Sequence, residues 1–367
     1  MTEEQIYKDF ITWAGKTWWE LPESEHLLPM IRANYSPEEA AFLTGFPHGA
    51  IRLEDLVDLK GRSSNELDPL LNELCRKGMV YKAVRGDSVH YRLNDTFFVF
   101  LRASYWPGGK DERSLKTAPA VNKYFMDNWF EQYSQVHHRG LRILPIAQTI
   151  QDDRTIIPYE DAVKVVDGFE FYAVSTCPCR HRHNLDPDMP ECPHPTEVCL
   201  HFDELGRYTV ENQLGREITR EETLEILKKA ADSGLVHGIS NWKVKPDTIC
   251  NCCSCCCMWL ESYHKLGHSK SLDASNYCVE INPETCRACG LCLKRCPMDA
   301  LQLHYSAQAK NKFFKAPVVD PEVCLGCGVC SHKCPTRSLI LRRREKITEP
   351  PETVRNYMQG YITDRTA

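Results

Sequence analysis

Two runs of cysteine toward the C-terminal end have the residue type and the spacing of a metal site. The first run places cysteines at 286, 289, 292 and 296, the second at 324, 327, 330 and 334, and a proline follows each run. Thiolates three residues apart wrap a tight loop around one metal centre, whereas the fourth cysteine of each run lies too far along to join it. A pair of zinc sites is the alternative, but zinc usually takes two separate Cys-x2–4-Cys pairs.

The doubled Cys-x2-Cys-x2-Cys-x3-Cys-Pro spacing resembles a bacterial-type ferredoxin, which holds two [4Fe-4S] clusters. In that pattern the fourth cysteine of each run ligates the other cluster. The resemblance implies one cluster on Cys286, Cys289, Cys292 and Cys334, and a second on Cys324, Cys327, Cys330 and Cys296. Strands are expected over 277–281 and 300–305, as partners, and again over 318–319 and 339–341.

A second region holds ten more cysteines between residues 177 and 257. They are Cys177, Cys179, Cys192, Cys199, Cys250, Cys252, Cys253, Cys255, Cys256 and Cys257. Thiols clustered this densely are not explained by core packing alone. A third [4Fe-4S] cluster on a subset of them is the leading hypothesis. A non-cubane cluster, a zinc site and a redox-active dithiol stay open, because the spacing does not select the ligands.

The order of motifs resembles a group of uncharacterised iron–sulfur proteins of anaerobes. The matching segments are Cys177 to Arg180, Gly234 to His237 and Ile249 to Cys253, followed by the doubled cysteine runs. The resemblance covers roughly residues 160–345 and implies a redox function without a defined reaction.

The chain is expected to be α+β, with six segments. They are an N-terminal helical segment (1–48), a winged-helix-like domain (49–117), a connecting helical and strand region (118–175), a Cys-rich region expected to hold a third metal site (176–275), the dicluster ferredoxin domain (276–346) and a C-terminal tail (347–367). Ser36-Pro37-Glu38-Glu39 has the composition of a helix start. Thr219 and Glu222 form a capping box that begins another helix, and Gly234 ends it.

The winged-helix-like outline consists of helices over 53–59 and 65–77 followed by two strands around a turn at 85–87. Such an outline invites a DNA-binding interpretation, but residues 64–78 carry a net charge of −1. A helix that reads a groove normally needs cations for phosphate contacts. We therefore favour a protein-docking module and do not expect nucleic acid to bind.

Charge and composition indicate what kind of partner the protein binds and in which cellular compartment it works. Residues 276–346 contain 12 Lys and Arg against 6 Asp and Glu, a balance of +6, which leaves −11 for the rest of the chain. This basic domain suggests docking to an acidic surface. The N-terminus lacks an apolar export signal, and no apolar run is long enough for a membrane span. Clustered cysteines of this kind indicate a reducing compartment, so we expect a cytoplasmic protein.

These features predict an electron-transfer protein that relays single electrons through two or three [4Fe-4S] clusters to or from a partner oxidoreductase. The sequence shows no nucleotide or flavin motif, so the catalytic residues, if any, are unassigned. One alternative is a redox-sensing transcription regulator that reads DNA with the winged helix. Another is a thiol or disulfide reductase that acts at the cysteines of 177–257.

Overall fold

The computed structural model describes residues 2–17, 20–126, 133, 136–150, 156–267 and 271–366. The chain forms two compact units, each built from three separate segments. Unit 1 comprises Met1–Tyr133, Ala173–Cys192 and Asp203–Glu217; unit 2 comprises Ser134–Tyr172, Pro193–Phe202 and Ile218–Ala367. Helices and strands are mixed in both units, so the fold is α+β. The six segment boundaries expected from the sequence stay predictions, and the connecting region 118–175 lies partly outside the described residues.

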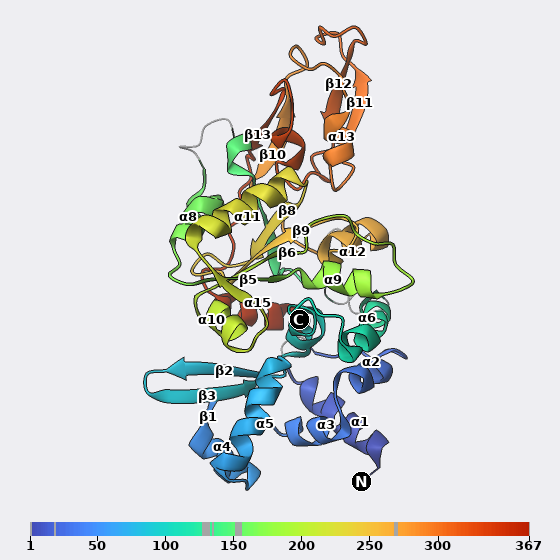
Figure 1. The fold of residues 1–367 in the computed structure, drawn as a ribbon. Coiled ribbons are helices and arrows are strands. Elements are labelled where there is room, and N and C mark those ends of the chain that lie inside the picture. Colours follow the sequence, from blue (N-terminus) through green and yellow to red (C-terminus); the bar gives the residue numbers. More distant parts are fainter. Residues whose placement is uncertain are drawn as a thin grey trace. The chain divides into compact units, whose positions relative to one another are not determined.

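The elements of unit 1 are mostly helical (Figure 1). They are α1 (Glu3–Ala14), α2 (Leu27–Asn34), α3 (Pro37–Leu43), β1 (Ile51–Arg52), α4 (Leu53–Lys60), α5 (Ser64–Arg76), β2 (Val80–Arg85), β3 (Ser88–Leu93), a π-helical turn (Phe98–Ala103), α6 (Glu112–Tyr124), β5 (Tyr172–Thr176), α9 (Pro178–Leu185), α10 (Asp203–Glu211) and β7 (Arg216–Ile218).

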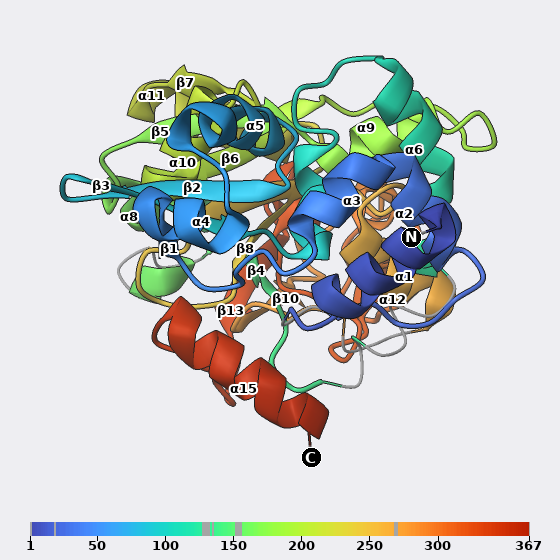
Figure 2. The same cartoon turned by 90° about the horizontal axis from the view of Figure 1, so that it is seen from below.

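The N-terminal part of unit 1 begins as the sequence predicts. Ser36 caps α3 by accepting a hydrogen bond from the Glu39 N–H, and the Glu39 carboxylate accepts one from the Ser36 N–H, so the capping box is complete. The helices α1, α2, α3 and α6 gather on one side of the unit, and α4, α5 and the β2–β3 hairpin lie on the other (Figure 2).

The β2–β3 hairpin is anchored inside unit 1 by α10. The Tyr208 ring stacks on Tyr81 with 4.4 Å between ring centroids, and its hydroxyl donates to the carbonyls of Cys75 and Val80 at 3.0 Å each. β3 pairs with both β1 and β2, giving the antiparallel order β1-β3-β2. The predicted helices and strands of residues 53–93 are therefore present.

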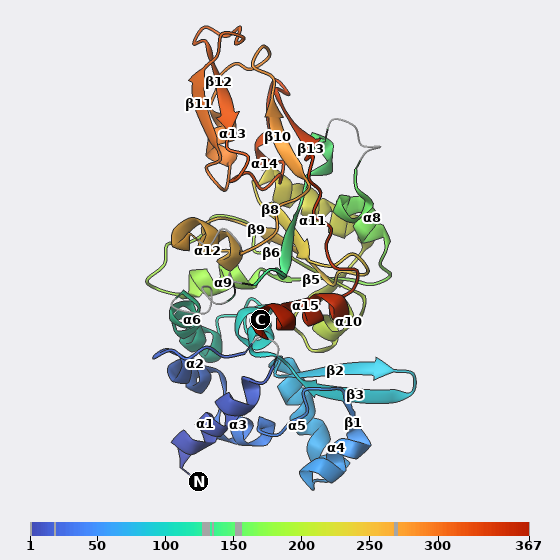
Figure 3. The same cartoon turned by 180° about the vertical axis from the view of Figure 1, so that it is seen from behind.

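Unit 2 contains a sheet, several helices and the two cysteine runs (Figure 3). Its elements are β4 (Leu141–Leu144), two 3-10 turns (Ala147–Thr149 and Pro158–Glu160), α8 (Ala162–Asp167), β6 (Glu197–Phe202), α11 (Arg220–Asp232), β8 (Val236–Ser240), β9 (Thr248–Cys252), α12 (Met258–Leu266), β10 (Tyr277–Ile281), α13 (Leu291–Arg295), β11 (Leu301–Tyr305), β12 (Lys315–Val319), α14 (Val329–His332), β13 (Leu339–Arg343) and α15 (Val354–Thr366).

The sheet of unit 2 runs in the order β4-β8-β9-β6, and these neighbours pair antiparallel. Helix α11 packs against β6 and β8. It begins where the sequence predicts, with Thr219 accepting a hydrogen bond from the Glu222 N–H at 3.1 Å, and Gly234 follows its end with φ of +84°.

The strands around the cysteine runs pair differently from the prediction. β10 pairs with β13, so Val279 lies opposite Leu341, and β11 pairs with β12, so Leu303 lies opposite Pro317. The expected partnership of 277–281 with 300–305 is wrong, and so is that of 318–319 with 339–341. The first strand of one half pairs with the last strand of the other, which interlocks the halves. Tyr277, Val279, Leu301, Leu339 and Leu341 form the buried core between them.

Candidate metal centres

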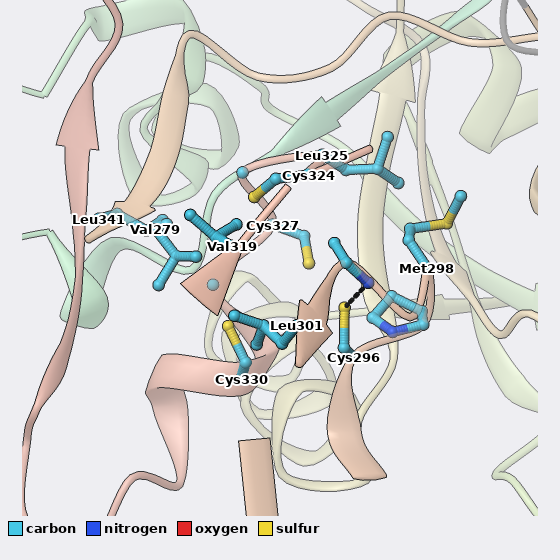
Figure 4. Close-up of a pocket in the computed structure, with 14 residues that line it drawn as sticks. Val279, Cys296, Met298, Leu301, Val319, Cys324, Leu325, Cys327, Cys330 and Leu341 are labelled. Atoms are coloured by element: carbon cyan, nitrogen blue, oxygen red, sulfur yellow. Dashed lines mark hydrogen bonds between the residues drawn. The ribbon is translucent and has the colours of Figure 1, made fainter. Parts of the chain in front are cut away.

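One small apolar pocket is lined by the second cysteine run and by one cysteine of the first (Figure 4). Cys324, Cys327 and Cys330 line it together with Cys296. Val279, Leu301, Val319, Leu325 and Leu341 complete its wall. The pocket thus combines sulfur donors with a lining that excludes water, which suits a sulfide-containing cluster.

The other small pocket has the reciprocal lining. Cys286, Cys289 and Cys292 of the first run meet Cys334 of the second. The structure therefore brings together the same two sets of four cysteines that the crossed spacing groups. Their assignment as ligands stays a prediction and is taken up below.

Backbone geometry sets the two loops. Gly290 and Gly328 each cap a short helix, α13 and α14, with φ of +72° and +80°. Such left-handed conformations strain residues that carry a Cβ. The Ala288 N–H donates to the Cys286 sulfur at 3.4 Å and the Ala300 N–H to the Cys296 sulfur at 3.3 Å, so amides already point at the sulfurs where cluster charge would reside.

The surroundings move the thiol pKa values in both directions. Burial raises the pKa of Cys327 to about 12 and that of Cys292 to about 11. A hydrogen bond from the Leu291 N–H lowers the pKa of Cys289, the most exposed of the eight. Since a metal binds thiolates, cluster insertion must release the protons from the buried thiols.

Cys278, to which the sequence assigned no ligand role, lies beside this site. Its thiol shares a hydrogen bond with Cys324, and that bond lowers the pKa of Cys324 to about 6. The sequence alone did not predict that Cys278 lies next to Cys324. Its position in β10 was a usable signal, because β10 flanks the pocket that the second cysteine run lines.

The ferredoxin-like part is fastened to the rest of unit 2 through hydrogen bonds. The Ile146 N–H donates to the Cys327 carbonyl at 3.0 Å, and the Ser275 N–H donates to the Leu325 carbonyl at 3.0 Å. The Arg295 guanidinium donates to the carbonyls of Ala231 and Asp232, at 3.0 and 3.3 Å, where α11 ends. The pocket walls are therefore continuous with the sheet of unit 2.

Three neighbouring cysteines of unit 2 form a compact thiol group. The sulfurs of Cys253, Cys255 and Cys256 all lie within 4.8 Å of one another. Cys192, in unit 1, is buried, and its N–H donates to the Asn184 side chain at 2.9 Å. Four thiolates around one tetrahedral zinc ion, at about 2.3 Å from the metal, would lie roughly 3.8 Å apart. The spacing of this group is that of ligands to a single metal ion.

The remaining cysteines of this region are placed on three elements. Cys177 and Cys179 lie at the start of α9, Cys199 lies on β6, and Cys250 and Cys252 lie on β9. Cys257 precedes α12. Cys199, Cys252 and Cys257 are buried.

Residues 285–338 match the family described as the 4Fe-4S dicluster domain. No curated protein and no solved structure matches the chain. The protein thus carries a ferredoxin-type domain toward its C-terminal end, and [4Fe-4S] clusters are its cofactors. The described residues include no helix that is both long and apolar enough to cross a membrane.

Proposed function

We propose that this protein relays single electrons through two [4Fe-4S] clusters to or from a partner oxidoreductase. Cys286, Cys289, Cys292 and Cys334 hold one cluster; Cys324, Cys327, Cys330 and Cys296 hold the other. The observation that carries the proposal is the crossed lining of the two pockets, each with three cysteines of one run and the fourth of the other.

Each cluster, when bound, accepts and releases one electron. The chain's own residues supply thiolates, shield the site with apolar side chains, and direct the Ala288 and Ala300 amides at sulfur. Hydrogen bonds to sulfur and exclusion of solvent set the reduction potential of such a site.

A matched pair of variants tests the crossed assignment. Cys296→Ala removes a residue of the first run and should abolish the cluster of the second run, while Cys334→Ala should do the reverse. Each variant should lose about four irons, since each [4Fe-4S] cluster holds four. Resolved electron paramagnetic resonance signals of the reduced protein identify the surviving cluster. Loss of the same signal in both variants would refute the assignment.

The partner contacts are proposed to involve the loop between β11 and β12. Phe313 and Phe314 of this loop are 54% and 56% exposed, and Tyr305 at the end of β11 is 75% exposed. The Lys312 ammonium lies 5.0 Å from the Phe313 ring centroid. Aromatic and cationic side chains displayed together fit an acidic protein surface that carries some apolar area.

The rates at which an anionic and a cationic metal complex oxidise the reduced protein test whether this surface attracts anions. Lys312→Glu should slow oxidation by the ferricyanide anion severalfold and leave oxidation by the hexaamminecobalt cation equal or faster. Lys8→Glu on α1, an exposed lysine paired with Glu4, serves as the matched control. If Lys312→Glu and Lys8→Glu change the oxidation rates equally, Lys312 has no special part in attracting the anionic complex.

We further propose that the segment from α3 to β3 is a winged-helix-like module that binds protein. Its order of α3, β1, α4, α5, β2 and β3 is that of a winged helix. The cations at the end of α5 are already matched with carboxylates: Arg76 with Glu73 at 3.4 Å, and Lys77 with Glu39 at 2.7 Å. Phosphate contacts would have to break these pairs.

The reducing interior that such clusters need also supports a cytoplasmic location and an anaerobic host.

A further inference from the structure

The strand β9 presents cysteines on one face of the sheet in unit 2. Successive side chains along a strand point to opposite faces, so Cys250 and Cys252 share a face and Asn251 faces the other way. The Asn251 side chain is fixed there, because it donates to the Val198 carbonyl at 2.7 Å and lies 2.6 Å from the Nδ1 atom of His237. The two thiols are thereby held in one orientation.

The neighbouring strand β6 brings a third thiol to the same face. Leu200 lies opposite Ile249 and His201 opposite Thr248 in this antiparallel pair. Continued by one residue pair, this register would set Cys199 opposite Cys250. Directly opposite residues of an antiparallel pair have their Cβ atoms about 5 Å apart and on one face.

A tight turn returns a fourth thiol to the end of the strand. The Cys257 N–H donates to the Cys253 carbonyl at 3.1 Å, which closes one turn of chain between β9 and α12. The Cys252 thiol shares hydrogen bonds with both Cys250 and Cys257, and these contacts, with burial, raise its pKa well above the ordinary value. The four cysteines therefore form a continuous row, which we call the β9 thiol row.

We propose that the β9 thiol row, Cys199, Cys250, Cys252 and Cys257, holds a [4Fe-4S] cluster that is separate from the compact thiol group. Four soft sulfur donors without oxygen ligands select zinc or iron–sulfur centres among the common metals. The row extends from one strand to the next and on to the turn. The 4Fe-4S dicluster domain of the same chain favours iron and sulfide over zinc as the occupant. In a [4Fe-4S] cluster each thiolate binds its own iron.

The octapeptide 250–257 would then serve two centres. Cys250, Cys252 and Cys257 belong to the β9 thiol row, while Cys253, Cys255 and Cys256 belong to the compact thiol group. The division explains why spacing alone did not reveal the ligands: neighbouring cysteines along the chain go to different centres. A cluster at this site would add a further centre to the proposed relay. The site itself does not depend on the two ferredoxin clusters.

The test uses the full chain, reconstituted anaerobically with iron and sulfide. Cys199→Ser and Cys252→Ser should each remove about four irons and four sulfides per chain while both ferredoxin signals persist. Cys75→Ser is the matched control, because Cys75 is a buried cysteine of α5 outside every thiol group, and it should keep all iron. Cys256→Ser should affect the compact thiol group, and its loss should add to that of Cys252→Ser.

Three results would overturn the proposal: full iron in both row variants, loss of one zinc in place of iron, or oxidation of the row to a disulfide in the reconstituted protein. If the row variants do not fold, the unsubstituted chain decides the question by iron and sulfide counting with ⁵⁷Fe Mössbauer spectroscopy. A content no greater than the eight irons of the two ferredoxin clusters contradicts the site. Failure of the Cys296 and Cys334 variants to behave as proposed would leave this result unaffected.

Discussion

Gly290 and Gly328 occupy equivalent positions in the two cysteine runs but have different surroundings. Both have φ in the left-handed region. A Cβ at Gly290 would meet nothing within 4 Å. A Cβ at Gly328 would lie 2.5 Å from the Thr149 Oγ1 atom, 3.2 Å from Leu341 Cδ1 and 3.4 Å from Ile146 Cβ. Substituting the two glycines in turn therefore distinguishes the cost of backbone strain, which both share, from the cost of steric overlap, which only Gly328 has.

Replacing either glycine with alanine should cost roughly 1–2 kcal/mol in free energy of unfolding, from the left-handed backbone. Gly328→Ala should cost about 1–3 kcal/mol more, because the methyl group overpacks a fixed wall. The adjacent Cys327 carbonyl accepts from the Ile146 N–H, so relief of the overlap shifts the cysteine loop itself. We expect Gly328→Ala to lose the cluster of the second run and Gly290→Ala to keep both clusters.

Anaerobic thermal unfolding, followed by visible absorbance and iron content, measures both effects. The double variant Gly328→Ala/Thr149→Ala should recover part of the loss. The single Thr149→Ala variant must be subtracted, because it also removes the 2.7 Å bond from the Thr149 hydroxyl to the Ile146 carbonyl. Equal destabilisation by the two glycine variants, or no recovery in the double variant, would refute the reasoning.

Two further predictions concern pH and nucleic acid. Burial lowers the pKa of His237 to about 4 from 6.5, so the unfolded chain takes up the proton first and stability falls as pH drops below 6.5 toward 4. Between pH 7.5 and 5.5 this should cost about 1.4 kcal/mol, and His237→Gln should remove that part of the slope in melting temperature; an unchanged slope contradicts it. The paired cations of α5 predict no specific duplex binding at physiological salt, and selection of one operator sequence with nanomolar affinity in a gel-shift experiment would reverse that conclusion.

Local chemistry was readable from the sequence, and pairing between distant segments was not. The caps at Ser36 and Thr219 depend on residues three positions apart, and the structure confirms both. The partner of β10 depends on how the two halves interlock, and the sequence-based choice was wrong. The alternation of Cys250 and Cys252 was visible in principle.

The approach of Cys199 toward Cys250 was not visible, because it follows from extending a register between strands almost fifty residues apart in the chain. The compact thiol group posed a similar problem, because its members between 253 and 256 are flanked in the chain by those of the β9 thiol row. Spacing identifies ligands when one loop supplies most of them, as each ferredoxin run supplies three of the four cysteines in its pocket. It fails when the tertiary fold selects among many candidate thiols.

The arginine that closes α11 has a consequence for how the protein matures. Arg295 lies 63 residues beyond Asp232, whose carbonyl it binds, and its Nε atom donates to the Val329 carbonyl a further 34 residues along. During translation the helix therefore emerges long before the group that completes its end. Arg295 is in turn oriented by the second cysteine loop. The end of α11 is therefore completed only after the second cysteine loop has been synthesised.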